Sequence, residues 1–343
     1  MTQPYKNNLL LDRLNGHQTA QIPVWLMRQA GRHLPGYKEL RKQEPDFLSF
    51  VRKPHLTSAA ALEPIQRYDL DAAIVFSDIL TIPHWLGWPV QFNGHTGIQI
   101  PAMQSMSDVS QLDISQLRRH LANWHAMADL RQHITDRPII GFVGAPWTLV
   151  CYCLSSSKDQ FSRARQILAQ NPDWFQQLLQ ILTSAIKYSI DTQVAQGADV
   201  IMVFDSWAGL CTPSSSDVLS PYMHEIIDHI SSHHVPSILF AKGQSYNIQS
   251  QFSPQCITLD WSQSPPANPN CAIQGLFDPA LLLTDPHTIE KTIEETIGKI
   301  NTHRYIANLG HGLLPHTPPE LVSCFVENIR KVKVRVYDKT LVE

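Results

Sequence analysis

Three arginines near the start of the chain, Arg28, Arg32 and Arg41, have the type and spacing of an anion-binding site. A guanidinium binds a carboxylate or a phosphate through two parallel hydrogen bonds, so several of them around one pocket favour a polyanionic ligand. The alternative is that these charges form a solvated helix face. Neither GxxxxGK[ST] nor GxGxxG occurs in the chain, which disfavours a nucleotide phosphate and favours a ligand rich in carboxylates.

Asp78 is a lone carboxylate between short apolar runs at 74–76 and 79–80. An unpaired buried charge is costly, so the sequence leaves two interpretations open. Asp78 either caps a helix or pairs with one of the arginines, or it accepts hydrogen bonds from a cationic or N–H-rich ligand.

His311 lies between two glycines, which let the backbone approach a ligand closely. A neutral imidazole at this position could donate a hydrogen bond to a carboxylate, and the alternative is a bond to a loop carbonyl. Tyr152 and Ser206 add hydroxyl groups beyond predicted strands and are weaker signals.

Short runs rich in Val, Ile and Phe recur along the whole chain, separated by patterns typical of helices. Most are continuous hydrophobic runs, as in parallel strands that are covered on both faces. Helices are predicted at 54–68, 172–196 and 318–331, each with a proline at its start. The predicted strands are 23–27, 72–76, 138–143, 199–204, 237–241, 256–259, 271–277 and 305–309. Eight strands that alternate with helices favour a single-domain α/β fold over residues 1–343, a (β/α)₈ TIM barrel, and a doubly wound open sheet is the competing fold.

Polar residues follow these strands. In a barrel the carboxyl ends of the strands share one face, where active sites are built. The arginines are therefore expected around the mouth of the barrel, together with the residues that follow the other strands: Asp78, Asp205, Ser206, Lys242, Asp260, Asp278 and His311.

The length, composition and net charge of the chain limit the class of protein. The 343 residues are 43% hydrophobic and 17% charged, with a net charge of −3, which argues against a nucleic-acid-binding protein. The first residues have no signal-peptide pattern, and no apolar run is long enough to cross a membrane. Six scattered cysteines favour reduced thiols, so we expect a cytoplasmic protein with no membrane partner.

Two patterns that imitate metal sites are interpreted as structural. His224 and His229 enclose a sequence similar to HExxH, but five positions turn a helix by about 500°, so the two rings do not share a face. Cys151 and Cys153 lack a second pair at zinc-finger spacing. No metal site is predicted.

Two long motifs stand near the ends of the chain, PVWLMRQAGRHLPGYKELR near the start and HRYIANLGHG near the end. Between them lie DAAIVFSDIL, GFVGAPWTL, VFDSWAG, LFAKG and LDW. Together these motifs resemble those of the uroporphyrinogen decarboxylase family over essentially the full length, and the first and last are the most specific. The fold that this resemblance implies is a single, distorted (β/α)₈ barrel.

The resemblance implies a reaction without metal or organic cofactor. Its substrate, uroporphyrinogen, is a cyclic tetrapyrrole with four acetates and four propionates, and the acetates lose CO₂ to leave the methyl groups of coproporphyrinogen. Asp78 would accept the pyrrole N–H bonds and stabilise the protonated ring, with Arg28 beside it in catalysis. The proton donor stays open between Arg28, a substrate carboxyl and a relayed water. The positions that match substrate contacts in the family are Arg28, Arg32, Arg41, Asp78, Tyr152, Ser206 and His311.

The chain departs from the family pattern at three places: His33 replaces a tyrosine, residues 154–158 replace a glycine-rich loop, and Leu276-Phe277 replaces Asn-Leu. These departures are expected to affect loop closure and rate more than the reaction.

Two alternatives remain. One is a corrinoid-dependent methyltransferase of the same superfamily, which would need a His-x-Cys zinc motif where this chain has Lys242-Gly243. The other is a tetrapyrrole-binding protein without turnover. The resemblance also implies a homodimer.

Overall fold

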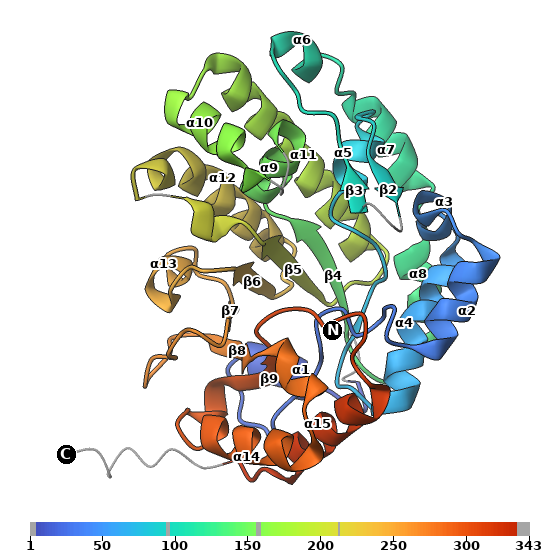
Figure 1. Cartoon of the computed structure of the whole chain (residues 1–343), viewed down its shortest axis with the longest axis vertical. Helices are drawn as coiled ribbons and strands as arrows, with labels where there is room; N and C mark the ends of the chain where they lie inside the picture. Colours follow the sequence, from blue (N-terminus) through green and yellow to red (C-terminus); the bar gives the residue numbers. More distant parts are fainter. Residues whose placement is uncertain (1–4, 94–96, 156–158, 212, 335–343) are drawn as a thin grey trace.

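Seven parallel strands form the central sheet, in the order β1-β4-β5-β6-β7-β8-β9. The computed structural model describes residues 5–93, 97–155, 159–211 and 213–334. The sheet curls through the middle of the molecule with helices outside it (Figure 1). Its strands are β1 (Ala73–Ile74), β4 (Ile139–Gly144), β5 (Val200–Asp205), β6 (Ser237–Ala241), β7 (Cys256–Leu259), β8 (Ala272–Phe277) and β9 (Tyr305–Leu309).

Segment 23–27 closes the barrel, but the prediction that it is a regular strand is wrong. It makes one isolated parallel bridge, Val24 to Ala307 of β9, and the Val24 carbonyl accepts a hydrogen bond from Asp71 N–H just before β1. Side-chain oxygens take the N–H groups that a ladder would use: the Asp71 carboxylate accepts from Val24 at 2.6 Å, and Asn308 Oδ1 accepts from Met27 at 3.1 Å. The result is a distorted TIM-type barrel, which confirms the predicted fold class.

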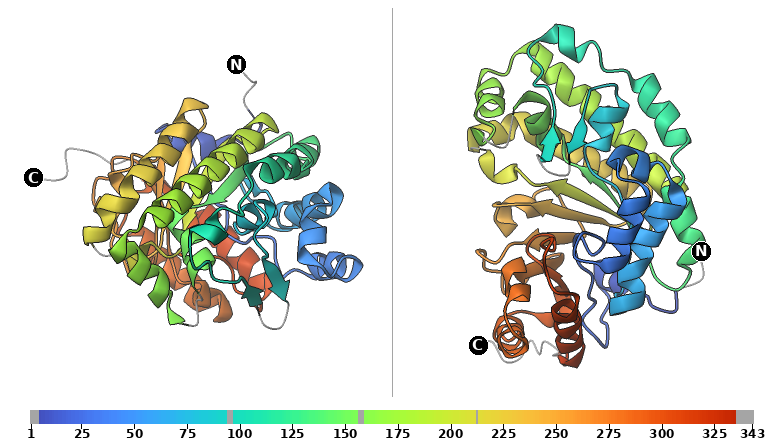
Figure 2. Two further views of the ribbon diagram at one scale, coloured as in Figure 1. Left: turned by 90° about the horizontal axis from the view of Figure 1, so that it is seen from above. Right: turned by 45° about the vertical axis from the view of Figure 1, so that its right-hand side comes forward.

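The helices surround this barrel, and both views in Figure 2 show them on its outside. The α-helices are α1 (Leu9–Leu14), α2 (Pro35–Gln43), α3 (Phe47–Val51), α4 (Pro54–Tyr68), α5 (Thr81–Trp85), α6 (Met106–Val109), α7 (Ile114–Ala122), α8 (Ala126–His133), α9 (Pro146–Leu154), α10 (Ser162–Gln170), α11 (Asp173–Ala195), α12 (Pro213–Ser232), α13 (Tyr246–Ser250), α14 (Pro286–Ile297) and α15 (Pro319–Lys331). Short 3₁₀ helices are η2 (Ala208–Leu210), η3 (Pro279–Leu283) and η4 (Thr302–Arg304).

The predicted helices agree with α4, α11 and α15. Helix α4 has the predicted bounds, whereas Pro172 and Pro318 precede α11 and α15 as extended N-cap residues instead of starting them. Among the described helices, none combines the length and the apolar character that crossing a membrane requires.

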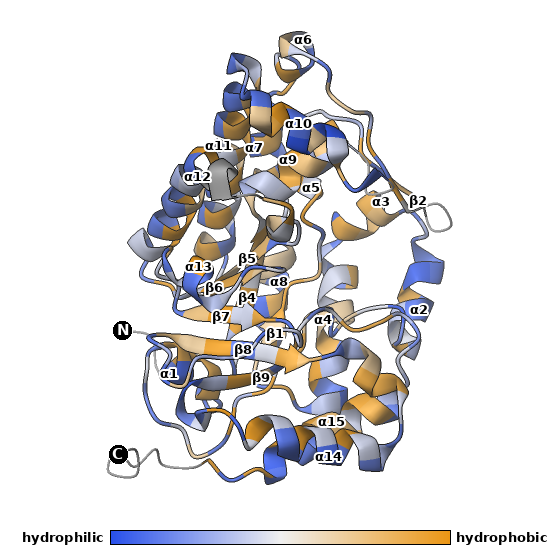
Figure 3. Ribbon diagram, turned by 60° about the vertical axis from the view of Figure 1, so that its left-hand side comes forward, coloured by the Kyte–Doolittle hydropathy of each residue, from blue (hydrophilic) through white to orange (hydrophobic). Residues whose placement is uncertain are grey.

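Two hydrophobic layers hold the barrel together. Because side chains alternate across a strand, one set of residues fills the barrel interior and the other meets the helices. The interior set includes Ile140, Met202, Ile238 and Phe240, and α1 adds Leu10 to this cluster. The outer set packs against helices such as α14 and α15, whose hydrophobic and hydrophilic residues alternate along the ribbon (Figure 3).

A two-stranded antiparallel hairpin, β2 (Gln91–Asn93) and β3 (Gly97–Gln99), lies outside the main sheet and was not predicted. Its strands are short, and the side chains of Gln91 and Gln99 are polar, so the sequence has no hydrophobic run there. Ile98 of β3 reaches the wall of the cavity described next.

Candidate active site

A cavity of about 430 Å³ opens where the carboxyl ends of the strands meet. Its walls come mainly from the segments that follow segment 23–27, β1, β5 and β9, with one side chain from α9. Six of the seven predicted site residues line this cavity: Arg28, Arg32, Asp78, Tyr152, Ser206 and His311. Their contacts with a substrate stay a prediction.

Three phenylalanines that the sequence analysis did not single out form the apolar inner part of the cavity. Phe142, Phe204 and Phe240 lie near the ends of three neighbouring strands, and the first two rings meet edge to face at 5.6 Å. Phe204 and Phe240 are register partners with ring centroids 6.0 Å apart. The signal that could have found them is an inward-facing phenylalanine near the end of each of three consecutive strands.

Asp78 is fixed by its own turn, and one of its carboxylate oxygens has no partner in the part of the chain that the structure describes. The Leu80 N–H donates to Asp78 Oδ1 at 2.8 Å, and the Asp78 carbonyl accepts from the Thr81 hydroxyl at 2.8 Å at the start of α5. Asp78 Oδ2 has no hydrogen-bond partner among the described residues, nor does any ion pair there involve this carboxylate. Burial raises the pKa of Asp78, while the Leu80 N–H and the Arg28 charge oppose that shift. Asp78 therefore presents a desolvated acceptor to the cavity.

Arg28 is held in an unusual backbone conformation beside Gly312. Its φ of 59° lies in the left-handed region, which a side chain other than glycine seldom adopts. Gly312 lines the same cavity, and a Cβ atom there would lie 2.4 Å from Arg28 Cδ. The absence of a side chain at 312 thus makes room for the arginine.

Arg28 and Arg32 are both exposed and lack an acidic partner in the described part of the chain. Their charge is therefore available for a ligand in the cavity. This placement is what an anion-binding site requires.

His311 is neutral at physiological pH. Burial, followed by the charges of Arg28 and Lys242, lowers the pKa of His311 to about 4. Its ring meets Phe240 edge to face at 5.8 Å. A neutral imidazole among cations can donate one hydrogen bond to a carboxylate without adding to their mutual repulsion.

Tyr152 and Ser206 complete the wall. The Tyr152 ring on α9 packs edge to face against Phe161 at 5.4 Å and Trp207 at 6.2 Å. Burial raises the pKa of Tyr152, so its hydroxyl stays protonated as a donor. Segment 154–158 is one of the places where the chain differs from the family pattern, and its residues 156–158 lie outside the described residues.

A buried carboxyl lies behind this wall. The Thr148 hydroxyl donates to Asp205 Oδ1 at 2.7 Å, and the Trp207 N–H donates to Thr148 Oγ1 at 3.2 Å. This network joins the segment that carries Ser206 to α9, which carries Tyr152. Burial raises the pKa of Asp205 to about 6, although the Thr148 hydrogen bond opposes the shift.

Arg41 does not line the cavity. Its guanidinium donates to the carbonyls of Glu44 at 3.0 Å and Pro45 at 2.7 Å, and it lies 5.2 Å from the centre of the Phe50 ring. These contacts satisfy carbonyl groups just beyond the last turn of α2. In this structure Arg41 is placed to stabilise the end of the helix.

His33 lies in the cavity wall itself rather than in a covering loop. It is 4% exposed, and its Nε2 has no hydrogen-bond partner among the described residues. Burial, with the charges of Lys38 and Arg67, lowers the pKa of His33 to about 4. Leu276, another departure, has a positive φ of 76° next to Gly275 in β8.

Comparison with known proteins decides the family. The family model "Uroporphyrinogen decarboxylase (URO-D)" matches residues 5–332. The chain belongs to the uroporphyrinogen decarboxylase family. Uroporphyrinogen decarboxylase of Coxiella burnetii (strain Dugway 5J108-111) is 37% identical over 350 residues, covering 96% of each chain. That of Dichelobacter nodosus (strain VCS1703A) is 36% identical, covering 95% of this chain and 98% of the relative. Both findings confirm the prediction that the chain is a decarboxylase.

A solved structure of this fold is a methyltransferase from Methanosarcina mazei. Its TM-score is 0.72 at 18% identity, and the match covers 95% of this chain and 98% of the other. At this identity the likeness shows the fold alone. Lys242 and Gly243 follow β6, at the place where the methyltransferase alternative requires a zinc-binding His-x-Cys pair.

Proposed function

We propose that this protein decarboxylates the four acetate side chains of uroporphyrinogen III, giving coproporphyrinogen III and CO₂ in porphyrin and haem biosynthesis. The observation that carries the proposal is that Arg28 and Arg32, which have no acidic partner among the described residues, line one cavity with Asp78, whose Oδ2 accepts no hydrogen bond from those residues. A ligand with carboxylates at its rim and N–H groups at its centre matches that distribution of charge.

The apolar inner part of the cavity supports the same ligand. The rings of Phe142, Phe204 and Phe240 offer aromatic surface to the pyrroles, while the cations stand nearer to the mouth. Aromatic pairs gain from edge-to-face and offset contacts, so a cyclic tetrapyrrole would be held by packing as well as by charge.

The reaction needs a place for the electrons of the departing carboxyl group. Protonation of a pyrrole carbon makes the ring an electron sink, the bond to the carboxylate carbon breaks, and its electron pair enters the ring. Net uptake of one proton replaces each CO₂ with hydrogen and leaves a methyl group. Asp78 would stabilise the cationic ring, and such preorganised charges contribute several kcal/mol, about 3–4 for one group.

Arg28 is assigned to hold the reacting acetate beside Asp78. A guanidinium holds its proton much more tightly than a carboxylic acid does, which makes it a weak acid for direct proton transfer. Its role is therefore to orient the carboxylate and a proton relayed through a substrate carboxyl or water. Arg32, Tyr152, Ser206 and His311 would bind the remaining carboxylates.

A turnover assay tests this proposal. Chelator-treated protein is incubated with uroporphyrinogen under reducing conditions, and the products are separated by their number of carboxyl groups. We expect stepwise loss of four carboxyls without added metal. Binding of the substrate without any loss would instead indicate the tetrapyrrole carrier, and loss only after zinc is restored would contradict the cofactor-independent reaction.

The homodimer is proposed from the resemblance and stays a prediction, as does the cytoplasmic location. Light scattering at micromolar protein concentration tests the dimer. Only monomers at that concentration would reject it.

A further inference from the structure

Three side chains that could bind a metal ion lie between α11 and α12, away from the cavity. They are Asp191 in α11, His229 in the last turn of α12 and His233 just beyond its end. Both helices end on the way to the amino ends of β5 and β6, whereas the cavity lies at the carboxyl ends of the strands. The cluster is therefore on the opposite face of the barrel and is separate from the proposed chemistry.

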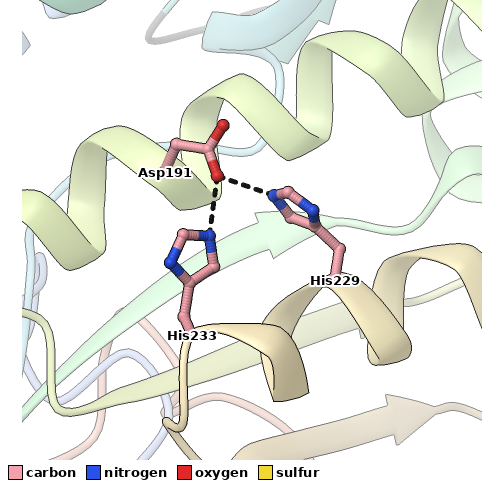
Figure 4. A group of neighbouring side chains, drawn as sticks. All are labelled: Asp191, His229 and His233. Carbon is pink, nitrogen blue, oxygen red and sulfur yellow. Dashed lines mark hydrogen bonds and ion pairs between the residues drawn. The ribbon is translucent and has the colours of Figure 1, made fainter.

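The two imidazoles point at the same carboxylate (Figure 4). His229 Nε2 lies 2.7 Å and His233 Nε2 lies 2.8 Å from Asp191 Oδ1. The ring planes are nearly perpendicular, at 82°, with centroids 5.1 Å apart. The four-residue spacing places both rings on the same side of α12, because residues four apart lie on one helix face.

We propose that Asp191, His229 and His233 form a binding site for a divalent transition-metal ion, with Zn²⁺ as the probe. All three donor atoms lie within 4.8 Å of one another. Imidazole nitrogen and carboxylate oxygen are ordinary zinc ligands at about 2.0–2.2 Å, so small side-chain rotations that separate the donors would admit the ion. With three protein ligands, a fourth position is left for water.

No lysine or arginine side chain among the described residues competes with a metal for the Asp191 carboxylate. In the described part of the chain Asp191 pairs with the two histidines but with no lysine or arginine. The neighbouring Lys187, one turn earlier in α11, is held by Glu225 at 2.8 Å, one turn earlier in α12. The side chains of His229, His233 and Asp191 are 20%, 30% and 43% exposed, so an ion can enter from solvent.

The competing explanation is that the trio is a hydrogen-bonded contact between the helices and binds nothing. That contact would stabilise α11 against α12 with or without zinc. Metal binding would add a stabilisation that rises with zinc concentration, because a ligand that binds only the folded state shifts the unfolding equilibrium. The two explanations therefore differ in a measurable way.

Zinc titration of the full chain tests the site, with calorimetry for affinity and Co²⁺ absorption spectra for coordination. His229→Ala, His233→Ala and Asp191→Asn each remove one ligand. His224→Ala is the matched control, because it removes an exposed histidine of the same helix whose ring contacts Phe252 and not the cluster. The chain has 16 histidines, so the readout is the difference between variants.

We expect the wild type and His224→Ala to bind one zinc ion that each ligand variant binds at least about tenfold more weakly. In the ligand variants, the zinc-dependent rise in Tm and the visible Co²⁺ bands should be lost. Equal zinc affinity and equal Tm shifts in all variants would overturn the proposal. So would ligand variants that lose stability without zinc while wild-type Tm does not respond to zinc. Neither readout depends on decarboxylase activity.

Discussion

Gly312 is packed so closely against Arg28 that a methyl group at 312 would lie 2.4 Å from Cδ and 2.5 Å from Cγ of the arginine. Arg28 itself has a left-handed backbone, with φ of 59°. A methyl group at 312 would therefore force the Arg28 stem to move, and the left-handed backbone offers little further relief. The position of its guanidinium in the cavity depends on the glycine.

Gly312→Ala should displace the Arg28 side chain and lower kcat/KM for uroporphyrinogen. Loss of one charged hydrogen bond costs about 1.5–3 kcal/mol, which corresponds to roughly tenfold to a hundredfold. Gly31→Ala is the comparison, because a Cβ there meets its nearest atoms at an ordinary 3.6 Å. An equal loss in both variants would show that the Arg28–Gly312 contact has no special role.

Arg41→Ala should lower stability more than it raises KM. It removes two hydrogen bonds to carbonyls and a contact with aromatic rings, together about 1–3 kcal/mol. Arg41→Lys keeps the charge but not the fork, so its free energy of unfolding should lie between the two. Urea unfolding and steady-state kinetics check this. A large rise in KM with unchanged stability would return Arg41 to the substrate-binding role implied by the resemblance.

Asp205→Asn should make the protein more stable than the wild type at pH 8. Burial raises the pKa of Asp205 from 3.8 to about 6, so the folded state binds the proton more tightly than the unfolded chain. The stabilising contribution of protonated Asp205 is full below pH 4 and is lost as the pH rises through 6. Asparagine imitates the protonated group and can still accept from Thr148.

The difference between Asp205→Asn and the wild type should grow by up to about 3 kcal/mol from acid to pH 8. Urea unfolding at pH 4 and pH 8 measures most of that change. A difference that is the same at both pH values would mean that Asp205 does not titrate in this window.

His33 should make the protein less stable as the pH falls from 6.5 toward 4. Its folded-state pKa of about 4 lies below the ordinary 6.5, so the unfolded chain takes up the proton first. His33→Phe removes this group, and its free energy of unfolding should fall less steeply over that range. Lys38→Met removes one of the charges that lower this pKa and should give an intermediate slope. Three parallel pH profiles would show that His33 is not the titrating group.

The continuous hydrophobic runs were enough to locate the strands of the sheet, because buried parallel strands need no alternation. They failed at segment 23–27, where the competing acceptors Asp71 and Asn308 come from distant parts of the chain. No local pattern carries that information.

Part of the site could also be predicted, because the strand positions fix where the residues after them lie. Positions after strands converge in any barrel, so Arg28, Asp78 and His311 could be placed together from the sequence. The contacts of Arg41 could not be predicted, because its guanidinium binds the carbonyls of Glu44 and Pro45. These carbonyls are within its reach only because of the conformation in which α2 ends.

The cluster between α11 and α12 was missed in part for a local reason. The HExxH-like pattern pointed to histidines five residues apart, His224 and His229, whereas the pair that meets is His229 and His233. Their spacing of four was visible in the sequence. Asp191, on another helix, was not.

The most direct test of the account compares kcat and KM for Asp78→Asn and Arg32→Ala with the wild type. Asp78→Asn keeps the shape and some hydrogen bonding but loses the charge that we propose to stabilise the protonated ring. We predict that it lowers kcat far more than it weakens binding, whereas Arg32→Ala mainly raises KM because its carboxylate contact persists throughout the reaction. If Asp78→Asn weakens binding but leaves kcat intact, Asp78 only docks the substrate, and its proposed role in decarboxylation is wrong.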